Sequence, residues 1–204
     1  MTRILSAIVL IPLAILIVVY APPLYYLISI GLIGTFCLYE YFGLMRGMGI
    51  QVQPLFGYLA FWVLLIAFRQ NRYPMGILLA LVLIAAFLSA SWRKCSVRER
   101  AMALMAESLG IFYFALFLYP AIALRFDFGS KAGLQWTLLL LAIIWAGDSA
   151  ALAVGKTLGK HPFAPVLSPK KTHEGAIGGL LGGILAGVLL QRLFFAELPL
   201  QHVI

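Results

Sequence analysis

The chain has 204 residues, of which 63% are hydrophobic and only 11% are charged. A soluble domain carries about 25% charged residues, so this composition excludes a water-soluble globular protein. The net charge of +8 does not by itself indicate nucleic-acid binding, because basic residues of membrane proteins also set orientation and meet anionic headgroups. We therefore expect an integral membrane protein.

The apolar residues form long continuous runs rather than the short alternating segments of a transmembrane β-barrel. A spanning helix needs about 20 residues, with a range of roughly 17 to 25. The sequence therefore predicts an all-α, polytopic helical bundle with about seven transmembrane helices. We expect one transmembrane domain over residues 1–204, with N-terminal helices in 1–136 and a motif-bearing helix-loop-helix in 137–204. The seven runs are 4–20, 24–44, 55–68, 75–91, 102–124, 137–155 and 176–195.

The basic residues are distributed unequally between the two sides of such a bundle. If all seven runs span, ten lysines and arginines lie on the side of the N-terminus and five on the other. The richer side holds Arg3, Arg46, Arg93, Lys94, Arg98, Arg100, Lys156, Lys160, Lys170 and Lys171. The poorer side holds Arg69, Arg72, Arg125, Lys131 and Arg192. The positive-inside rule then predicts that the N-terminus and the lysine-rich loop 156–171 are cytoplasmic.

One acid, Asp148, lies inside the sixth apolar run. A carboxylate at the centre of a span costs at least about 2.5 kcal/mol on insertion scales, so such residues usually line a polar site. We expect Asp148 to be a metal or substrate ligand near the cytoplasmic end of the run. The alternative is an acid at the membrane interface that pairs with a lysine of the loop.

The segment 168–175 reads S-P-K-K-T-H-E-G and leads into the seventh run. Ser168 is a good N-cap and Pro169 a good first helical residue, so we expect a helix to begin here. Its free amide groups, with Lys170 and Lys171 beside them, would attract phosphate. The alternative is that the two lysines only flank a span on its cytoplasmic side.

The last run combines an acid at its start with a regular series of glycines. Glu174 has two interpretations: it offsets Lys170 four residues earlier, or it holds a cation together with Asp148. The glycines build a smooth stripe for close helix packing, and we expect the run to dock on the sixth. The stripe consists of Gly175, Gly178, Gly179, Gly182, Gly183 and Gly187.

At these residues the chain resembles the phosphatidate cytidylyltransferases, also called CDP-diglyceride synthases. Residues 148–151 read D-S-A-A, residues 159–160 read G-K, and 168–175 follow as given above. The consensus sequence of the family is close to D-[TS]-G-A-Y, then G-K, then S-P-K-K-T-W-E-G. Ala150 stands where glycine is usual, and His173 replaces the tryptophan. The hydrophobic N-terminal part also fits.

The resemblance implies an enzyme that transfers CMP from CTP to phosphatidic acid in phospholipid biosynthesis. The products would be CDP-diacylglycerol and pyrophosphate, and Mg²⁺ would be required. Such an enzyme would lie in a bacterial cytoplasmic (inner) membrane, with CTP, phosphatidic acid and membrane lipid as partners, a homodimer as a possible assembly, and no nucleic acid.

The resemblance also implies roles for single residues. Asp148, Lys170 and Lys171 would be catalytic. The substrate-binding residues would be Lys160, Ser168, Lys170, Lys171 and Thr172. Asp148 and Glu174 would hold the metal ion or organise the polar site around it.

The most diagnostic signature of the family, S-x-x-K-R…K-D…P-G-H-G-G…D-R-x-D, supplies its acidic metal ligands and has no match in this sequence. We expect either a C-terminally truncated copy or a degenerate relative, and whether the 204-residue form is itself active stays open. Two other functions stay open. The chain could be a transporter or channel subunit with Asp148 as a cation site, or a non-catalytic membrane scaffold.

Overall fold

The computed structural model describes residues 2–70, 74–92, 94–166 and 168–196. Arg72 and Arg93, which entered the charge count, lie outside these residues. The described residues form seven helices, one for each predicted run. The helices are α1 (Thr2–Tyr20), α2 (Pro23–Gly47), α3 (Pro54–Gln70), α4 (Met75–Ser91), α5 (Val97–Phe126), α6 (Ser130–Thr157) and α7 (His173–Phe194).

Four helices, α2, α5, α6 and α7, are long and apolar enough to cross a membrane. The helices α3 and α4 have 17 residues each, at the lower end of the usual range. Large apolar side chains such as Phe36, Leu109 and Leu180 are exposed on the surface of these helices. That surface suits lipid and not water, and the chain is an integral membrane protein built from helices.

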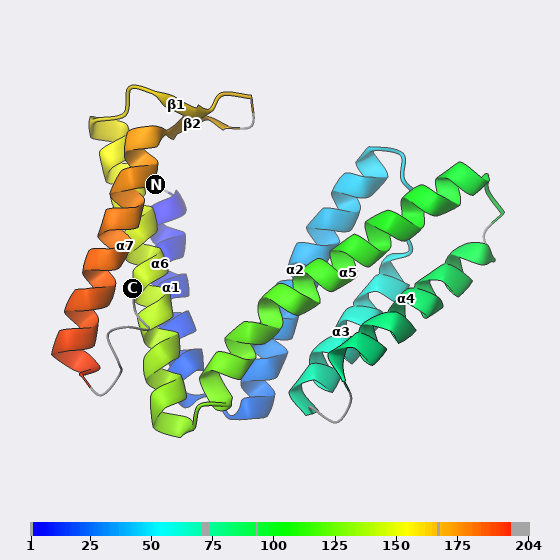
Figure 1. Ribbon diagram of the computed structural model, residues 1–204, viewed down its shortest axis with the longest axis horizontal. Helices are drawn as coiled ribbons and strands as arrows, with labels where there is room; N and C mark the ends of the chain where they lie inside the picture. Colours follow the sequence, from blue (N-terminus) through cyan, green and yellow to red (C-terminus); the bar gives the residue numbers. More distant parts are fainter. Residues whose placement is uncertain (1, 71–73, 93, 167, 197–204) are drawn as a thin grey trace. The chain divides into compact units, whose positions relative to one another are not determined.

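The chain divides into two compact units, Met1–Phe126 and Asp127–Ile204. In the first unit, α5 packs against α2, α3 and α4 (Figure 1), and α1 makes a smaller contact with α2. Its core contains fully buried side chains of Leu38, Phe42 and Phe61. The ring of Phe42 lies against Gly57, where an added methyl group would clash with it. Small residues thus let these helices approach closely, as is usual in membranes.

Two charged side chains are buried in the first unit and connect its helices. Glu107 of α5 is fully buried and accepts a hydrogen bond from the backbone N–H of Gln53 at 2.5 Å, directly before α3 begins. Arg125 donates from Nε to the carbonyl oxygen of Val18, in the last turn of α1, at 2.8 Å. Both partners are groups at helix ends that have no bond within their own helix. These charges therefore hold helices together.

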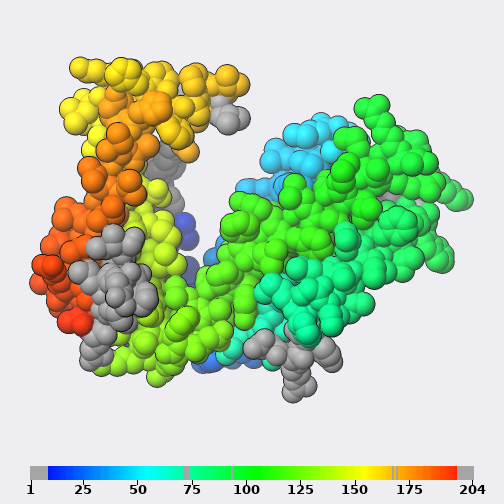
Figure 2. Space-filling view, in the orientation of Figure 1, coloured from blue at the N-terminus to red at the C-terminus, as the bar shows by residue number. Residues whose placement is uncertain are grey.

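The second unit consists of α6 and α7, packed along their length, and a two-stranded antiparallel hairpin between them (Figure 1). The strands are β1 (Pro162–Ala164) and β2 (Ser168–Thr172), with Pro162 opposite Thr172 and Ala164 opposite Ser168. Figure 2 shows the hairpin, in yellow and orange, extending sideways from the ends of the two helices.

The glycine stripe of α7 packs on α6, as predicted. A methyl group at Gly178 would lie 2.6 Å from Cβ of Val154, and one at Gly179 would lie 2.9 Å from Cβ of Ala151. Real Cβ atoms do not approach neighbours this closely, so only glycine allows this helix separation. Without a hydrophobic driving force in lipid, such close packing is what holds two spanning helices together.

The predicted start of the last helix is wrong. Ser168 and Pro169 belong to strand β2, and α7 begins four residues later at His173. Thr172 is the N-cap: its backbone is extended, and its Oγ1 accepts a hydrogen bond from the N–H of Gly175 at 3.2 Å. Serine and threonine are both good N-caps, so local preference did not decide between them. The pairing of 168–172 with β1 keeps these residues extended and moves the cap.

Candidate functional site

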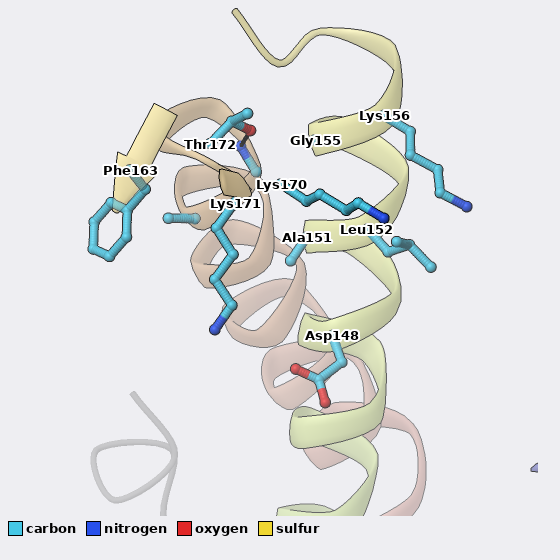
Figure 3. Close-up of a pocket in the computed structure, with 11 residues that line it drawn as sticks. Asp148, Ala151, Leu152, Gly155, Lys156, Phe163, Lys170, Lys171 and Thr172 are labelled. Carbon is cyan, nitrogen blue, oxygen red and sulfur yellow. Dashed lines mark hydrogen bonds between the residues drawn. The ribbon is translucent and has the colours of Figure 1, made fainter. Parts of the chain in front are cut away.

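A cleft of about 560 Å³ lies in the second unit, between α6, the hairpin and the first turn of α7 (Figure 3). Helix α6 contributes the side chain of the intramembrane acid, and the hairpin contributes the paired lysines. The charged and polar residues that line the cleft are Asp148, Lys156, Lys170, Lys171 and Thr172. The structure therefore brings together two motifs that are about 20 residues apart in the sequence.

Asp148 is exposed to the cleft and makes no hydrogen bond or ion pair with any described residue. Its neighbour Ser149 donates instead to the carbonyl oxygen of Trp145 on the same helix, at 2.7 Å. The alternative role, an acid that pairs with a loop lysine, would require an ion pair that these side chains do not form. The carboxylate of Asp148 stays available to a ligand.

Lys170 and Lys171 are consecutive residues of β2, and both are exposed. Because successive side chains of a strand leave on opposite faces, the two ammonium groups diverge. In Figure 3 the Lys170 side chain crosses in front of α6, whereas that of Lys171 runs along the cleft towards the level of Asp148. Neither lysine side chain has a hydrogen-bond or ion-pair partner among the described residues, so both ammonium groups stay available to a ligand.

The carboxylate of Glu174 binds the hairpin and not Lys170. Its Oε2 accepts hydrogen bonds from the backbone N–H groups of Lys160 and His161, at 3.1 and 3.3 Å. Its Oε1 lies 2.5 Å from Nδ1 of His161. An acid in the first turn of α7 also interacts favourably with the helix dipole. Glu174 thus fixes the entry of the hairpin to the start of α7, and its role as a metal ligand stays a prediction.

Thr172 occupies a tight junction between β2, α6 and α7. A methyl group at Gly159 would lie 2.7 Å from Oγ1 of Thr172, and one at Gly155 would lie 3.4 Å from it. One at Gly175 would lie 3.0 Å from the carbonyl oxygen of Ala151. Gly159 and Gly175 are therefore needed for space, because the end of α6 lies directly against the capping threonine and the start of α7, whereas a methyl group at Gly155 would make an ordinary contact.

Not every predicted site residue lines the cleft. Ser168 is paired with Ala164 at the far end of β2, and Lys160 contributes a backbone N–H to Glu174. The cleft also contains Phe163, which no sequence pattern had singled out. The only signal for Phe163 was an aromatic side chain within the lysine-rich segment 156–171.

An apolar groove of about 440 Å³ continues from the charged cleft along α6 and α7. Both are bordered by Asp148, Ala151 and Ala176. The other residues that line the groove are aliphatic residues and glycines. The aliphatic residues are Ile143, Ile144, Leu180 and Ile184, and the glycines are Gly147, Gly179 and Gly183. Asp148 therefore stands where a charged cleft meets a surface that suits hydrocarbon.

Two known proteins illustrate the similarity of this chain to others. A phosphatidate cytidylyltransferase of Staphylococcus aureus (strain COL) is 43% identical over 63 residues, which are 30% of this chain and 24% of that protein. One of Staphylococcus haemolyticus (strain JCSC1435) is 26% identical over 154 residues, which are 72% of this chain and 55% of that protein. The chain thus spans about half or less of the curated relatives it matches.

No solved structure matches the chain. A family model described as the cytidylyltransferase family, in contrast, matches residues 1–204. Because this match extends over the whole chain, the protein belongs to the cytidylyltransferase family.

Proposed function

We propose that the protein transfers CMP from CTP to phosphatidic acid and forms CDP-diacylglycerol and pyrophosphate. The observation that carries this proposal is the cleft in which Lys170, Lys171 and Asp148 meet at the end of two helices long enough to span a membrane. Such a cleft offers positive charge to phosphates next to lipid. The family and the named relatives agree with this choice of reaction.

In this reaction an oxygen of the lipid phosphate attacks the α-phosphorus of CTP. The new P–O bond forms while the bond from the α-phosphorus to the bridging oxygen breaks, and pyrophosphate leaves with that oxygen. Transfers at phosphorus depend mainly on positioning and on neutralising negative charge. Lys170 and Lys171 would supply this charge, and the capped start of α7 would add the partial charge of its amide groups.

A magnesium ion fits the cleft only if the protein and the substrate phosphates hold it together. Mg²⁺ is usually held by one or two carboxylates together with substrate phosphates and water. Asp148 is the one carboxylate that lines the cleft among the described residues, which contain no group of three residues suited to a metal ion. Asp148 would therefore hold the ion together with phosphate oxygens, and the ion would offset charge on the phosphates.

The proposed reaction also requires an orientation. CTP is a cytosolic nucleotide, so the hairpin should face the cytoplasm of a bacterial cell, as the positive-inside rule predicts. The apolar groove that begins at Asp148 then points into the membrane from which the lipid arrives.

The test is an assay of the purified chain with labelled CTP, phosphatidic acid and Mg²⁺. CDP-diacylglycerol should form, and Lys171→Ala should lower its rate by two to three orders of magnitude, roughly the cost of one charge-stabilising group. Arg192→Ala removes the same charge from the other end of α7 and is the matched control. If the wild-type chain neither binds CTP nor forms product, the proposed function is wrong.

A further inference from the structure

We propose that Phe163 is the stacking platform for the base of the nucleotide that enters the charged cleft. This inference rests on the proposed function, because it names the binding site for one part of the same substrate. It starts from an aromatic side chain of β1 that lines the cleft but remains 53% exposed.

The surroundings of Phe163 keep its ring in place without covering it. Its ring centroid lies 5.1 Å from that of His173, with an angle of 70° between the planes. This edge-to-face geometry is a favourable aromatic contact. Since His173 is the first residue of α7, and Glu174 beside it binds the hairpin, the ring is held against a fixed helix start.

The cleft has two chemically different ends. Phe163 stands on the hairpin side, Asp148 lies further along α6, and the Lys171 side chain extends between their levels (Figure 3). The apolar groove opens at the Asp148 end and offers aliphatic side chains over about 440 Å³. A lipid phosphate, which is attached to hydrocarbon chains, suits that end.

A nucleoside triphosphate has the complementary form, a flat ring system joined to a chain of phosphates. An exposed aromatic ring beside two lysines matches it: the lysines attract the phosphates, and the ring takes the base. When an aromatic side chain stacks on a base, removing that side chain weakens binding of the nucleotide by roughly five- to 150-fold. Stacking does not distinguish one base from another, so Phe163 would supply affinity and position but not the choice of cytosine.

The experiment compares two ligands that differ only in the nucleoside. The purified 204-residue chain is titrated with CTP and with inorganic tripolyphosphate in the presence of Mg²⁺. Phe163→Leu, which keeps an apolar side chain of similar size, should weaken CTP binding roughly tenfold and leave tripolyphosphate binding unchanged. Phe194→Leu, at the other end of α7, should change neither.

Phe163→Trp provides the second readout. It should retain the affinity for CTP, and CTP should change the fluorescence that the new indole adds, whereas tripolyphosphate should not. Unchanged CTP binding in Phe163→Leu would overturn the inference and show that the ring has another role, such as a contact with the membrane surface. An equal loss of both ligands would also overturn it, because the residue would then only support the fold. A wild-type chain that binds neither ligand and forms no product would overturn the proposed function itself.

Discussion

The carboxylate of Glu174 lies 2.5 Å from Nδ1 of His161, thirteen residues earlier in the chain. The same carboxylate accepts the backbone N–H groups of Lys160 and His161. One side chain therefore joins the segment that leaves α6 to the segment that begins α7, and the hairpin with the paired lysines is held between them. The position of the two positive charges depends on an acid that does not itself line the cleft.

Replacing this acid should loosen the hairpin. In Glu174→Ala the amides of Lys160 and His161 lose their acceptor, and we expect their hydrogen exchange to become roughly two- to fivefold faster, as for the loss of a modest net hydrogen bond. Glu174→Gln should show a smaller change because it retains one carbonyl acceptor. Exchange measured by mass spectrometry over residues 156–166 tests this. Equal exchange in the wild type and Glu174→Ala would show that other contacts hold the hairpin.

The cap of α7 can be tested by a single hydroxyl group. Thr172→Ala should lower the free energy of unfolding by about 1 kcal/mol, because the N–H of Gly175 loses its acceptor. Thr172→Ser should retain most of the stability. Ser168→Ala should have little effect, since Ser168 caps no helix in this structure. Thermal unfolding in detergent measures the stability of all three variants. A larger loss of stability in Ser168→Ala than in Thr172→Ala would show that Ser168 caps the helix, as the sequence predicted.

The helix pair of the second unit contains a complementary small pair, Ala150 and Gly182. A methyl group at Gly182 would clash with Cβ of Ala150. We expect Gly182→Ala to destabilise the protein by about 1–3 kcal/mol through overpacking, and the double variant with Ala150→Gly to recover most of this loss. Gly43→Ala is the control, because a methyl group there would meet no atom within 4 Å. Independent, additive effects of the two substitutions would show that they are not in contact.

The orientation is open to labelling at the tip of the hairpin. Val166 is 97% exposed, so a cysteine there should react fully with a soluble reagent. In a variant with Cys37 and Cys95 replaced by serine, Val166→Cys should be protected in intact cells from a reagent that does not cross the membrane, and should react after lysis. Labelling in intact cells would place the hairpin outside and exclude a cytosolic nucleotide as substrate.

The fold class and the number of helices followed from the sequence because hydrocarbon leaves little choice of structure. A long apolar run must satisfy its backbone within a helix, and each predicted run became one. The glycine stripe predicted close packing on α6 for a similar reason, since glycines spaced along one face serve close helix contact in lipid. The grouping of Asp148 with Lys170 and Lys171 was also foreseeable, because the motif places them on either side of one short loop.

The sequence by itself determined that this chain is a helical membrane protein with a lysine-rich segment between its last two helices. Only the tertiary structure decided that this segment is a hairpin, that α7 begins after Thr172, and that Glu174 binds the hairpin. It also placed Phe163 in the cleft. These outcomes depend on contacts between residues that are four to fourteen positions apart, where local preferences allow several choices. The pairing of β1 with β2 decides where α7 begins, because residues whose backbone is hydrogen-bonded in a strand pair cannot also be part of a helix.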